Sequence, residues 1–329
     1  MHPKTILITG ANGFIGYGAV LYFAQLPSFK VIAALRKMPP NLSFPANVKV
    51  IEGLDIRQEK GWAQALLSVD CVLHCAARYH IPKNPFLNTL KICRQINVEG
   101  SLLVARNAIL AKVQRFIFIS SIKVHGEKNL ADIPFREDDK LRPLYAYGIS
   151  KMEAEKELKK ICEISSMELV IIRPPPVYGD RVPANFLLML KCINWGLPLP
   201  IKRAINLRSY VAMDNLLALV YIVASHPKAA GEIFLVGDDR DWSLVDLINI
   251  LSLAMKKTVF LFSVSPTLLK LGGMFFGKKP DVNLLFLPSV VDTTKARERI
   301  GWIPTIKSEN ALQNTARSFL KSITQNKIN

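Results

Sequence analysis

The chain has 329 residues, 50% of them hydrophobic, and its 43 Lys and Arg against 26 Asp and Glu give a net charge of +17. This length and composition predict a large core and two lobes. The five cysteines include no Cys-x-x-Cys pair, which excludes the zinc and disulfide patterns, and no apolar run reaches the roughly 20 residues of a membrane span.

Strands and helices alternate through the first half of the chain. Residues 5–9 are a short β-branched run that predicts a buried strand, and a glycine-rich turn and an apolar helix to about Gln25 follow it. A long helical pattern covers 86–111, and another helix starts near Tyr145. Five more strands are expected at 30–35, 48–52, 69–74, 115–120 and 168–173. This alternation predicts an α/β fold with a Rossmann-type, doubly wound parallel sheet.

The pattern changes after Pro176. Helices are expected at 184–195 and 214–224 with a strand at 232–236, and the chain is mostly helical from Trp242 onward. We therefore expect a smaller, mostly helical C-terminal lobe built from interleaved segments. The expected domains are a cofactor domain of 1–172 plus about 206–240, and a substrate lobe of 173–205 plus 241–329.

Two stretches bear on partners of a basic protein. The densest basic run, 156–160, alternates with glutamates as on an exposed helix face, and no nucleic-acid-binding motif accompanies it, so we expect no nucleic-acid partner. Polar residues interrupt the apolar stretch 259–277, which favours a helix packed in the second lobe. Peripheral contact of this stretch with a membrane is the alternative. The N-terminal apolar run is too short for a signal peptide, so we expect a cytoplasmic protein.

Three glycines join the first strand to the first helix. Gly10 permits a tight turn, Gly13 lets the backbone approach a pyrophosphate, and Gly16 lets the helix pack close to the sheet. The pyrophosphate would then lie on the free N–H groups of the helix N-terminus. The alternative is a glycine-rich turn without a ligand.

A tyrosine and a lysine four residues apart, Tyr147 and Lys151, would share one helix face. A lysine ammonium beside a phenol stabilises the phenolate, so we expect the pKa of Tyr147 to fall below about 10. Such a tyrosine could move a proton at a hydroxyl or a carbonyl. The same spacing also occurs on ordinary solvated helices.

Together, the turn Thr9-Gly-Ala-Asn-Gly-Phe-Ile-Gly16 and the Tyr147-x-x-x-Lys151 pair resemble an extended short-chain dehydrogenase/reductase of the NAD-dependent epimerase/dehydratase family. The resemblance covers nearly the whole chain. It implies a catalytic set of Ser121, Tyr147 and Lys151, because residues 120–126 match the family's Ser-Ser-x-x-Val-Tyr-Gly pattern. It also implies an NAD(P) site formed by Gly10, Asn12, Gly13, Phe14, Ile15, Gly16, Asp55, Ile56, Ala76, Ala77, Asn97, Tyr147, Lys151 and Pro174. No metal is implied.

We assign no catalytic role to the histidines near the expected site. The family carries a histidine at the position of His74, and His125 takes the place of the family's usual tyrosine. His80 is the remaining histidine near the expected site.

The chain departs from the family pattern at two positions. An NAD-preferring site places an acidic residue after the second strand, whereas this chain has Arg36 and Lys37, which favour a 2′-phosphate and hence NADP over NAD. A basic loop without this role is the alternative. The sugar 4,6-dehydratases follow the catalytic hydroxyl with an Asp-Glu pair, and here Ile122 and Lys123 replace it. The resemblance therefore disfavours dehydration.

On the substrate side, the segment 208–214 resembles the family's Arg-x-Tyr-x-x-x-Asp segment, in which the arginine binds the substrate diphosphate. The resemblance implies that Arg208, Asn185, Phe186 and Ser121 bind a UDP-sugar. The motifs look closest to a subgroup of UDP-N-acetylquinovosamine dehydrogenases, which are 4-ketoreductases of surface-polysaccharide synthesis such as lipopolysaccharide, and of UDP-glucose 4-epimerases.

We expect an NAD(P)-dependent oxidoreductase that works at carbon 4 of a UDP-hexose or UDP-N-acetylhexosamine, as a 4-ketoreductase. A 4-epimerase that retains NAD is the first alternative. A hydroxysteroid-type lipid alcohol dehydrogenase and a non-catalytic cofactor-binding scaffold are the others. The resemblance also suggests a homodimer through the helices at 86–111 and 145–165.

Overall fold

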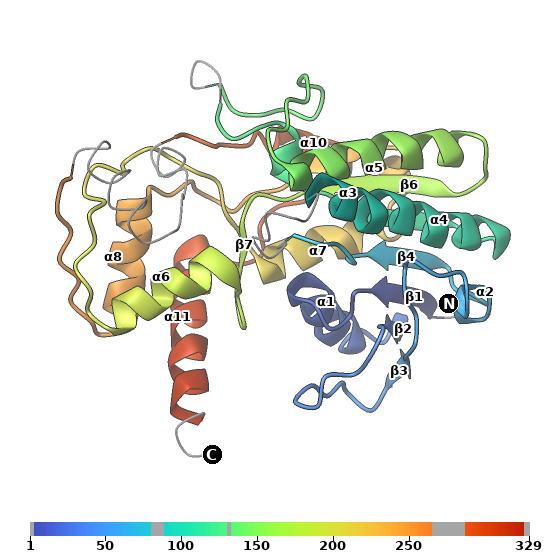
Figure 1. Ribbon diagram of the computed structural model, residues 1–329, viewed down its shortest axis with the longest axis horizontal. Coiled ribbons are helices and arrows are strands. Elements are labelled where there is room, and N and C mark those ends of the chain that lie inside the picture. Colours follow the sequence, from blue (N-terminus) through green and yellow to red (C-terminus); the bar gives the residue numbers. More distant parts are fainter. Residues whose placement is uncertain (1–2, 80–88, 130–132, 265–286, 326–329) are drawn as a thin grey trace.

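A sheet of seven parallel strands lies at the centre of the computed structural model, which describes residues 3–79, 89–129, 133–264 and 287–325 (Figure 1). The strands lie in the order β3-β2-β1-β4-β5-β6-β9, and each pairs in parallel with its neighbour. Their bounds are β1 Lys4–Thr9, β2 Phe29–Ala34, β3 Val48–Ile51, β4 Cys71–His74, β5 Arg115–Ile119, β6 Glu168–Arg173 and β9 Ile233–Leu235. The strand order reverses between β1 and β4, which is where ligands of doubly wound sheets bind.

Both faces of the sheet are buried, because successive side chains of a strand point to opposite faces. In β1, Ile6 and Ile8 belong to one hydrophobic cluster, while Leu7 belongs to the other. The first cluster joins the sheet to α1 (Phe14–Ala24), α7 (Met213–Val223) and α10 (Thr294–Ile300). The second joins it to α2 (Trp62–Ala65), α4 (Gly100–Leu110) and α5 (Ala146–Glu163). Figure 1 shows α1 and α4 on opposite sides of the sheet.

The long helix expected at 86–111 is a composite of three segments. The structure describes it from α3 (Thr89–Cys93) through a π-helical stretch, Arg94–Glu99, into α4; residues 86–88 lie outside the described residues. Single π-helical turns inside α-helices are frequent at functional sites. This stretch carries Asn97, one of the expected site residues.

The second lobe has its own hydrophobic core. It contains α6 (Ala184–Asn194), α8 (Leu244–Ala254) and α11 (Ser308–Gln325), with the short strands β7 (Val177–Tyr178) and β8 (Val211–Ala212) beside them. Figure 1 shows these helices together at one end of the sheet. The predicted fold class, a doubly wound parallel sheet with a smaller, mostly helical lobe, is confirmed.

Two details differ from the sequence pattern. The described part of 259–277 is extended, not helical as expected. Helix α8 is followed by Lys256, which has a φ of +53°. Beyond it, the carbonyl of Phe260 accepts a hydrogen bond from the N–H of Leu199 at 2.9 Å. Residues 265–277 lie outside the described residues. In addition, Ala296 and Ile300 of α10 pack in the cluster that contains β1, although 241–329 was expected in the second lobe; the division into two domains as a whole stays a prediction. Within the described ranges, no helix is both long and apolar enough to span a membrane.

Candidate active site

The glycine turn closes tightly between β1 and α1. Gly10 has a φ of +63°, and a Cβ there would lie 2.8 Å from the backbone of Ala76, while a Cβ at Gly16 would lie 2.2 Å from the carbonyl oxygen of Gly10. Only glycine fits both positions. The turn ends at Gly13, the N-cap of α1, so the N–H groups of Phe14 and Ile15 have no acceptor within the helix. This turn has the shape and the free donors that a pyrophosphate requires.

The loops after β2 and β3 bring Arg36 close to Asp55. Asp55 binds Arg57 with N–O distances of 2.6 to 3.2 Å, and this hydrogen bonding lowers the pKa of Asp55, with a smaller lowering from the charge of Arg36. Arg36 and Lys37 are exposed, whereas Ile56 is buried. The expected adenine and ribose contacts therefore lie together at the carboxyl ends of β2 and β3.

The chain after β4 is fixed by a buried histidine. His74 is 0% exposed and its two ring nitrogens lie 3.1 Å from the Thr9 hydroxyl and 3.0 Å from the Ser101 hydroxyl. Burial lowers the pKa of His74 to about 3, so the ring is neutral. Thr9 also accepts from the N–H of Ala76 at 3.2 Å, which holds Ala76, and Ala77 after it, opposite the glycine turn. His74 thus has a structural role. His80 lies outside the described residues.

Asn97 links this loop to the start of α5. Its amide accepts from the N–H of Arg78 at 2.7 Å and donates to the Ser150 hydroxyl at 2.9 Å, and Ser150 donates to the carbonyl of Tyr147 at 2.8 Å. Asn97 is fully buried. A buried amide with all of these partners fixes the helical turn that carries Tyr147.

Ser121 and Tyr147 meet because α5 begins very close to the turn after β5. A Cβ at Gly148 would lie 2.6 Å from the carbonyl oxygen of Lys123, so only glycine allows this approach. Ser121 caps the short helix Ile122–Val124, and its side chain forms a hydrogen bond with Tyr147. The carbonyl of Pro174, after β6, accepts from Ile122 at 2.9 Å. The carboxyl ends of β5 and β6 therefore meet at the first turn of α5.

The pKa of Tyr147 does not follow the sequence-based expectation. Burial raises the pKa of Tyr147 above its usual value. Tyr79, whose ring meets that of Tyr147 edge-on at 4.9 Å, raises this pKa further. The hydrogen bond from Ser121 lowers the pKa, but by less than burial raises it. Lys151 is 1% exposed, and burial lowers its pKa to about 7. The expected lowering was wrong, because burial disfavours both the phenolate and the ammonium.

A buried ion pair under Lys151 was missed by the sequence reasoning. Arg173, at the end of β6, binds Glu155 at 2.7 Å, and both side chains are 3% exposed. Glu155 also accepts from Ser120 at 2.5 Å, and its charge raises the pKa of Lys151. Two sequence features could have indicated this pair: Glu155 lies four residues after Lys151, and Arg173 directly precedes three prolines.

The expected substrate residues lie in or beside the second lobe. Phe186 is buried and stacks on Tyr178 at 5.6 Å, whereas Asn185 is exposed. Arg208 donates to the carbonyl of Leu287 at 3.1 Å and forms a side-chain hydrogen bond with Tyr210. Phe186 therefore contributes to the core of the second lobe.

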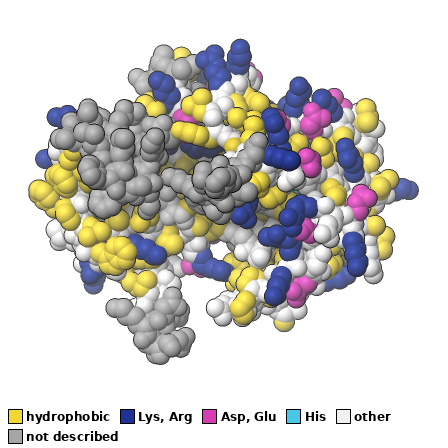
Figure 2. Space-filling view, in the orientation of Figure 1, with side chains coloured by type: hydrophobic (Ala, Val, Ile, Leu, Met, Phe, Trp, Pro, Cys, Tyr) yellow, Lys and Arg dark blue, Asp and Glu magenta, His cyan; other side chains and the backbone are white. Residues whose placement is uncertain are grey.

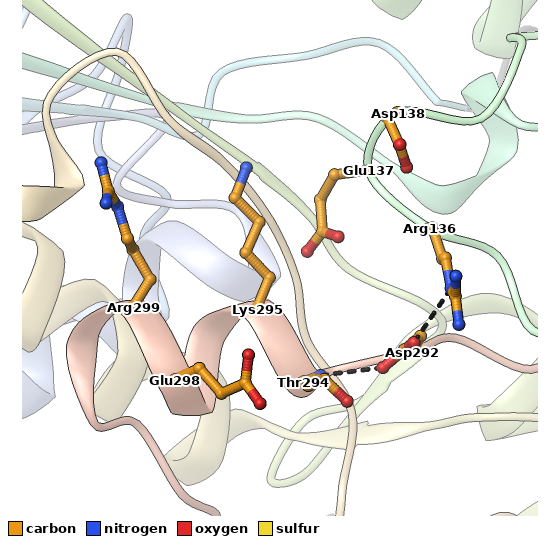
Figure 3. A pocket seen from close by; sticks show the side chains of 8 residues that line it. All are labelled: Arg136, Glu137, Asp138, Asp292, Thr294, Lys295, Glu298 and Arg299. Atoms are coloured by element: carbon orange, nitrogen blue, oxygen red, sulfur yellow. Dashed lines mark hydrogen bonds and ion pairs between the residues drawn. The ribbon is translucent and has the colours of Figure 1, made fainter.

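Two hollows lie on the described part of the protein. One of about 490 Å³ runs from Asn12 and Gly13 along the outer side of α1 to Arg181 of the second lobe. The other, of about 390 Å³, lies beside α10 (Figure 3). Its cations are paired: Arg136 binds Asp292 at 3.2 Å, and Lys295 and Arg299 bind Glu232 at 2.8 and 3.0 Å. We therefore assign no anionic substrate to this charged hollow.

Known proteins share the sequence and the fold. The model of the NAD dependent epimerase/dehydratase family matches residues 6–237. A UDP-glucose 4-epimerase of Vibrio cholerae is 37% identical over 326 residues, which are 97% of each chain. The structure of UDP-glucuronic acid 4-epimerase from Bacillus cereus in complex with NAD has a TM-score of 0.80 at 21% identity, over 97% of this chain and 99% of that one. UDP-glucose 4-epimerase from Thermotoga maritima with UDP-glucose has a TM-score of 0.78 at 23% identity, over 97% and 100%.

The two structural likenesses show the fold. The family model covers well over half of the chain, and the Vibrio cholerae relative spans nearly all of it. With the glycine turn and the Ser121–Tyr147–Lys151 arrangement, these matches establish that the chain is an enzyme of the NAD-dependent epimerase/dehydratase family.

Proposed function

We propose that this enzyme binds NAD(P) at the glycine turn and exchanges hydride with carbon 4 of a UDP-hexose or UDP-N-acetylhexosamine. The observation that carries the proposal is the contact of Ser121 with Tyr147, one helical turn from the buried Lys151, at the carboxyl end of the sheet. The names of the Vibrio cholerae and Thermotoga maritima proteins point to the same substrate class.

The residues present fit a dinucleotide. Gly10 and Gly16 leave no room for a side chain at the turn, and the first N–H groups of α1 are free to receive a pyrophosphate. When bound, the nicotinamide supplies the hydride chemistry. The proposed holders of the cofactor are Gly10, Asn12, Gly13, Phe14, Ile15, Gly16, Arg36, Lys37, Asp55, Ile56, Ala76, Ala77, Asn97, Tyr147, Lys151 and Pro174.

Each catalytic side chain has a proton task. The Tyr147 phenol moves the proton of the oxygen on carbon 4, and the Ser121 hydroxyl hydrogen-bonds that same oxygen. The protonated Lys151 ammonium stabilises the phenolate, and the negative charge of Glu155 helps to keep Lys151 protonated. Carboxylates that could drive dehydration are replaced by Ile122 and by Lys123, which itself pairs with Glu127.

Two reactions share this chemistry. A 4-epimerase returns the hydride to the opposite face of the same sugar and keeps its cofactor, and the 37% identical relative favours this form. A 4-ketoreductase of the UDP-N-acetylquinovosamine dehydrogenase type releases the cofactor after one transfer, and the exposed Arg36 and Lys37 favour it through NADP. We also propose that the enzyme serves lipopolysaccharide synthesis in the cytoplasm and forms a homodimer through the helices at 86–111 and 145–165.

The direct test is incubation of the purified enzyme with UDP-glucose and with UDP-N-acetylglucosamine, followed by NMR of the product and absorbance of the reduced nicotinamide. Conversion at carbon 4 without added cofactor identifies an epimerase. Turnover of a 4-keto sugar that consumes added NADPH or NADH identifies a reductase. Absence of both, in a protein that still binds NAD, would refute the proposed reaction.

A further inference from the structure

Four exposed apolar side chains gather where α6 and α8 end. Trp195 and Leu197 follow α6 and are 62% and 41% exposed, and Leu253 in the last turn of α8 and Phe260 beyond it are 77% and 70% exposed. The two segments lie side by side, because Leu199 donates to the carbonyl of Phe260 and Lys202 to that of Phe262 at 2.9 and 3.1 Å. Single exposed apolar residues are ordinary, but several of them on adjoining segments form a candidate interaction surface.

Five cations lie on the same segments as these apolar residues. Lys191, Lys202, Arg203, Lys256 and Lys257 are all exposed. The segments 181–213 and 247–264, which form this part of the lobe, contain no Asp or Glu. Figure 2 shows hydrophobic side chains interspersed with lysine and arginine at the end of the molecule that holds α6 and α8. We call these nine residues the apolar–basic patch.

We propose that the apolar–basic patch docks the enzyme on an anionic lipid bilayer. A tryptophan and leucines that stand out from a basic surface match the interface of a membrane, where rings and alkyl chains enter the headgroup region and cations meet phosphate. A nucleic acid would pair with the cations but offers little to Leu197 and Leu253. A second copy of the same patch would place equal charges against each other.

The active site would stay open to its substrate in this orientation. Helix α6 runs from Asn185, an expected substrate residue, to the patch at Trp195, about 15 Å along its axis. The bilayer would therefore meet the distal end of the second lobe, while the carboxyl edge of the sheet stays outside it. The proposal does not depend on which sugar the enzyme uses.

The chain carries its own reporter for the test. Of its four tryptophans, Trp62, Trp242 and Trp302 are at most 3% exposed, so changes in emission on a bilayer come mainly from Trp195. We would mix the full chain with vesicles of phosphatidylcholine alone or with phosphatidylglycerol. We expect co-sedimentation with the anionic vesicles, a blue shift of the emission, and quenching by brominated acyl chains. Added salt should weaken binding.

Matched variants locate the contact. Lys256→Glu with Lys257→Glu should lower vesicle affinity about tenfold or more, because each cation near an anionic surface contributes several-fold. Phe260→Ser should also lower it. The controls are Lys49→Glu with Lys60→Glu, and Leu67→Ser, which alter exposed residues of the cofactor domain. Thermal unfolding checks that each variant folds.

Three results would overturn the proposal. They are no binding of the wild type to anionic vesicles, equal losses in patch and control variants, and patch-dependent self-association in sedimentation velocity without lipid. The last would make the patch a subunit interface.

Discussion

Arg173 and Glu155 form a buried ion pair at 2.7 Å that joins the end of β6 to the helix carrying Tyr147 and Lys151. Ser120, the neighbour of Ser121, donates to the same carboxylate. Arg173 also donates to the carbonyl of Glu137 at 2.8 Å, and one of its N–H groups lies 3.0 Å from a ring nitrogen of His125. The Glu155 carboxylate thus joins helix α5, which carries Tyr147 and Lys151, to the turn before Ser121 and to the end of β6.

Glu155→Gln should lower both stability and turnover. Removing one partner of a buried pair leaves an unpaired charge, at a cost of about 3–5 kcal/mol. The loss of the carboxylate charge also lowers the pKa of Lys151 further, so turnover at neutral pH should fall. Glu153→Gln is the matched control, because Glu153 pairs with the exposed Arg94 at the surface, so this variant should lose little stability. Chemical unfolding and kcat measure the two effects. Equal stability of the two variants would contradict the role of the pair.

Tyr147→Phe should reduce kcat by a factor of about 10² or more, since a positioned acid–base group contributes 10²–10⁴-fold. Binding of NAD, measured by calorimetry, should change little, because the ring and Gly148 remain in place. Tyr79→Phe is the control: its ring packs against Tyr147, and removing its hydroxyl leaves that contact intact. Activity of Tyr147→Phe within a few-fold of the wild type would be incompatible with the proposed proton transfer.

Gly148→Ala should separate Tyr147 from Ser121. The added methyl group would lie 2.6 Å from the carbonyl oxygen of Lys123, so the first turn of α5 must move away. We expect a large loss of kcat in a protein that still folds. In Gly18→Ala, the atoms nearest to the new methyl group belong to the flexible side chain of Met213, the first at 3.0 Å, so this variant should keep its activity. Similar activities of both variants would show that the close approach is dispensable.

Lys151 should make stability depend on pH. Its folded pKa of about 7 lies below the ordinary value of 10.5, so the unfolded chain binds more protons between these limits. Stability from this residue is therefore lowest below pH 7 and rises as the pH increases toward 10.5. At pH 6, Lys151→Met should be more stable than the wild type by about a few kcal/mol, and it should lose this advantage at high pH. Urea unfolding of both proteins across this range measures the difference; a constant difference would contradict it.

Arg36 and Lys37 should affect NADP more than NAD. If they bind the 2′-phosphate, Arg36→Ala with Lys37→Ala should raise the Kd for NADP about tenfold or more, because each charged hydrogen bond contributes about 1.5–3 kcal/mol. The Kd for NAD should change only slightly. Lys49→Ala and Lys60→Ala provide the control for lost surface charge. Equal changes for both cofactors would remove the argument for NADP.

The sequence alone determined the fold class and the identity of the motifs. The β-branched run before Gly10, the glycine spacing and the Tyr147-x-x-x-Lys151 pair depend on short-range rules of turn geometry and helix periodicity, so they can be recognised in the chain itself. The strands that follow the same rules were predicted to within about two residues.

The tertiary structure decided the electrostatics and the supports of the site. Burial comes from packing of distant segments, so only the fold shows that Tyr147 is half-buried, that Lys151 is buried, and that burial moves both pKa values toward the neutral forms. The pairing of Glu155 with Arg173, 18 residues apart in the chain, likewise depends on the meeting of α5 and β6. The π-helical turn at Asn97 and the extended chain after Lys256 are two further features that the local sequence pattern did not predict.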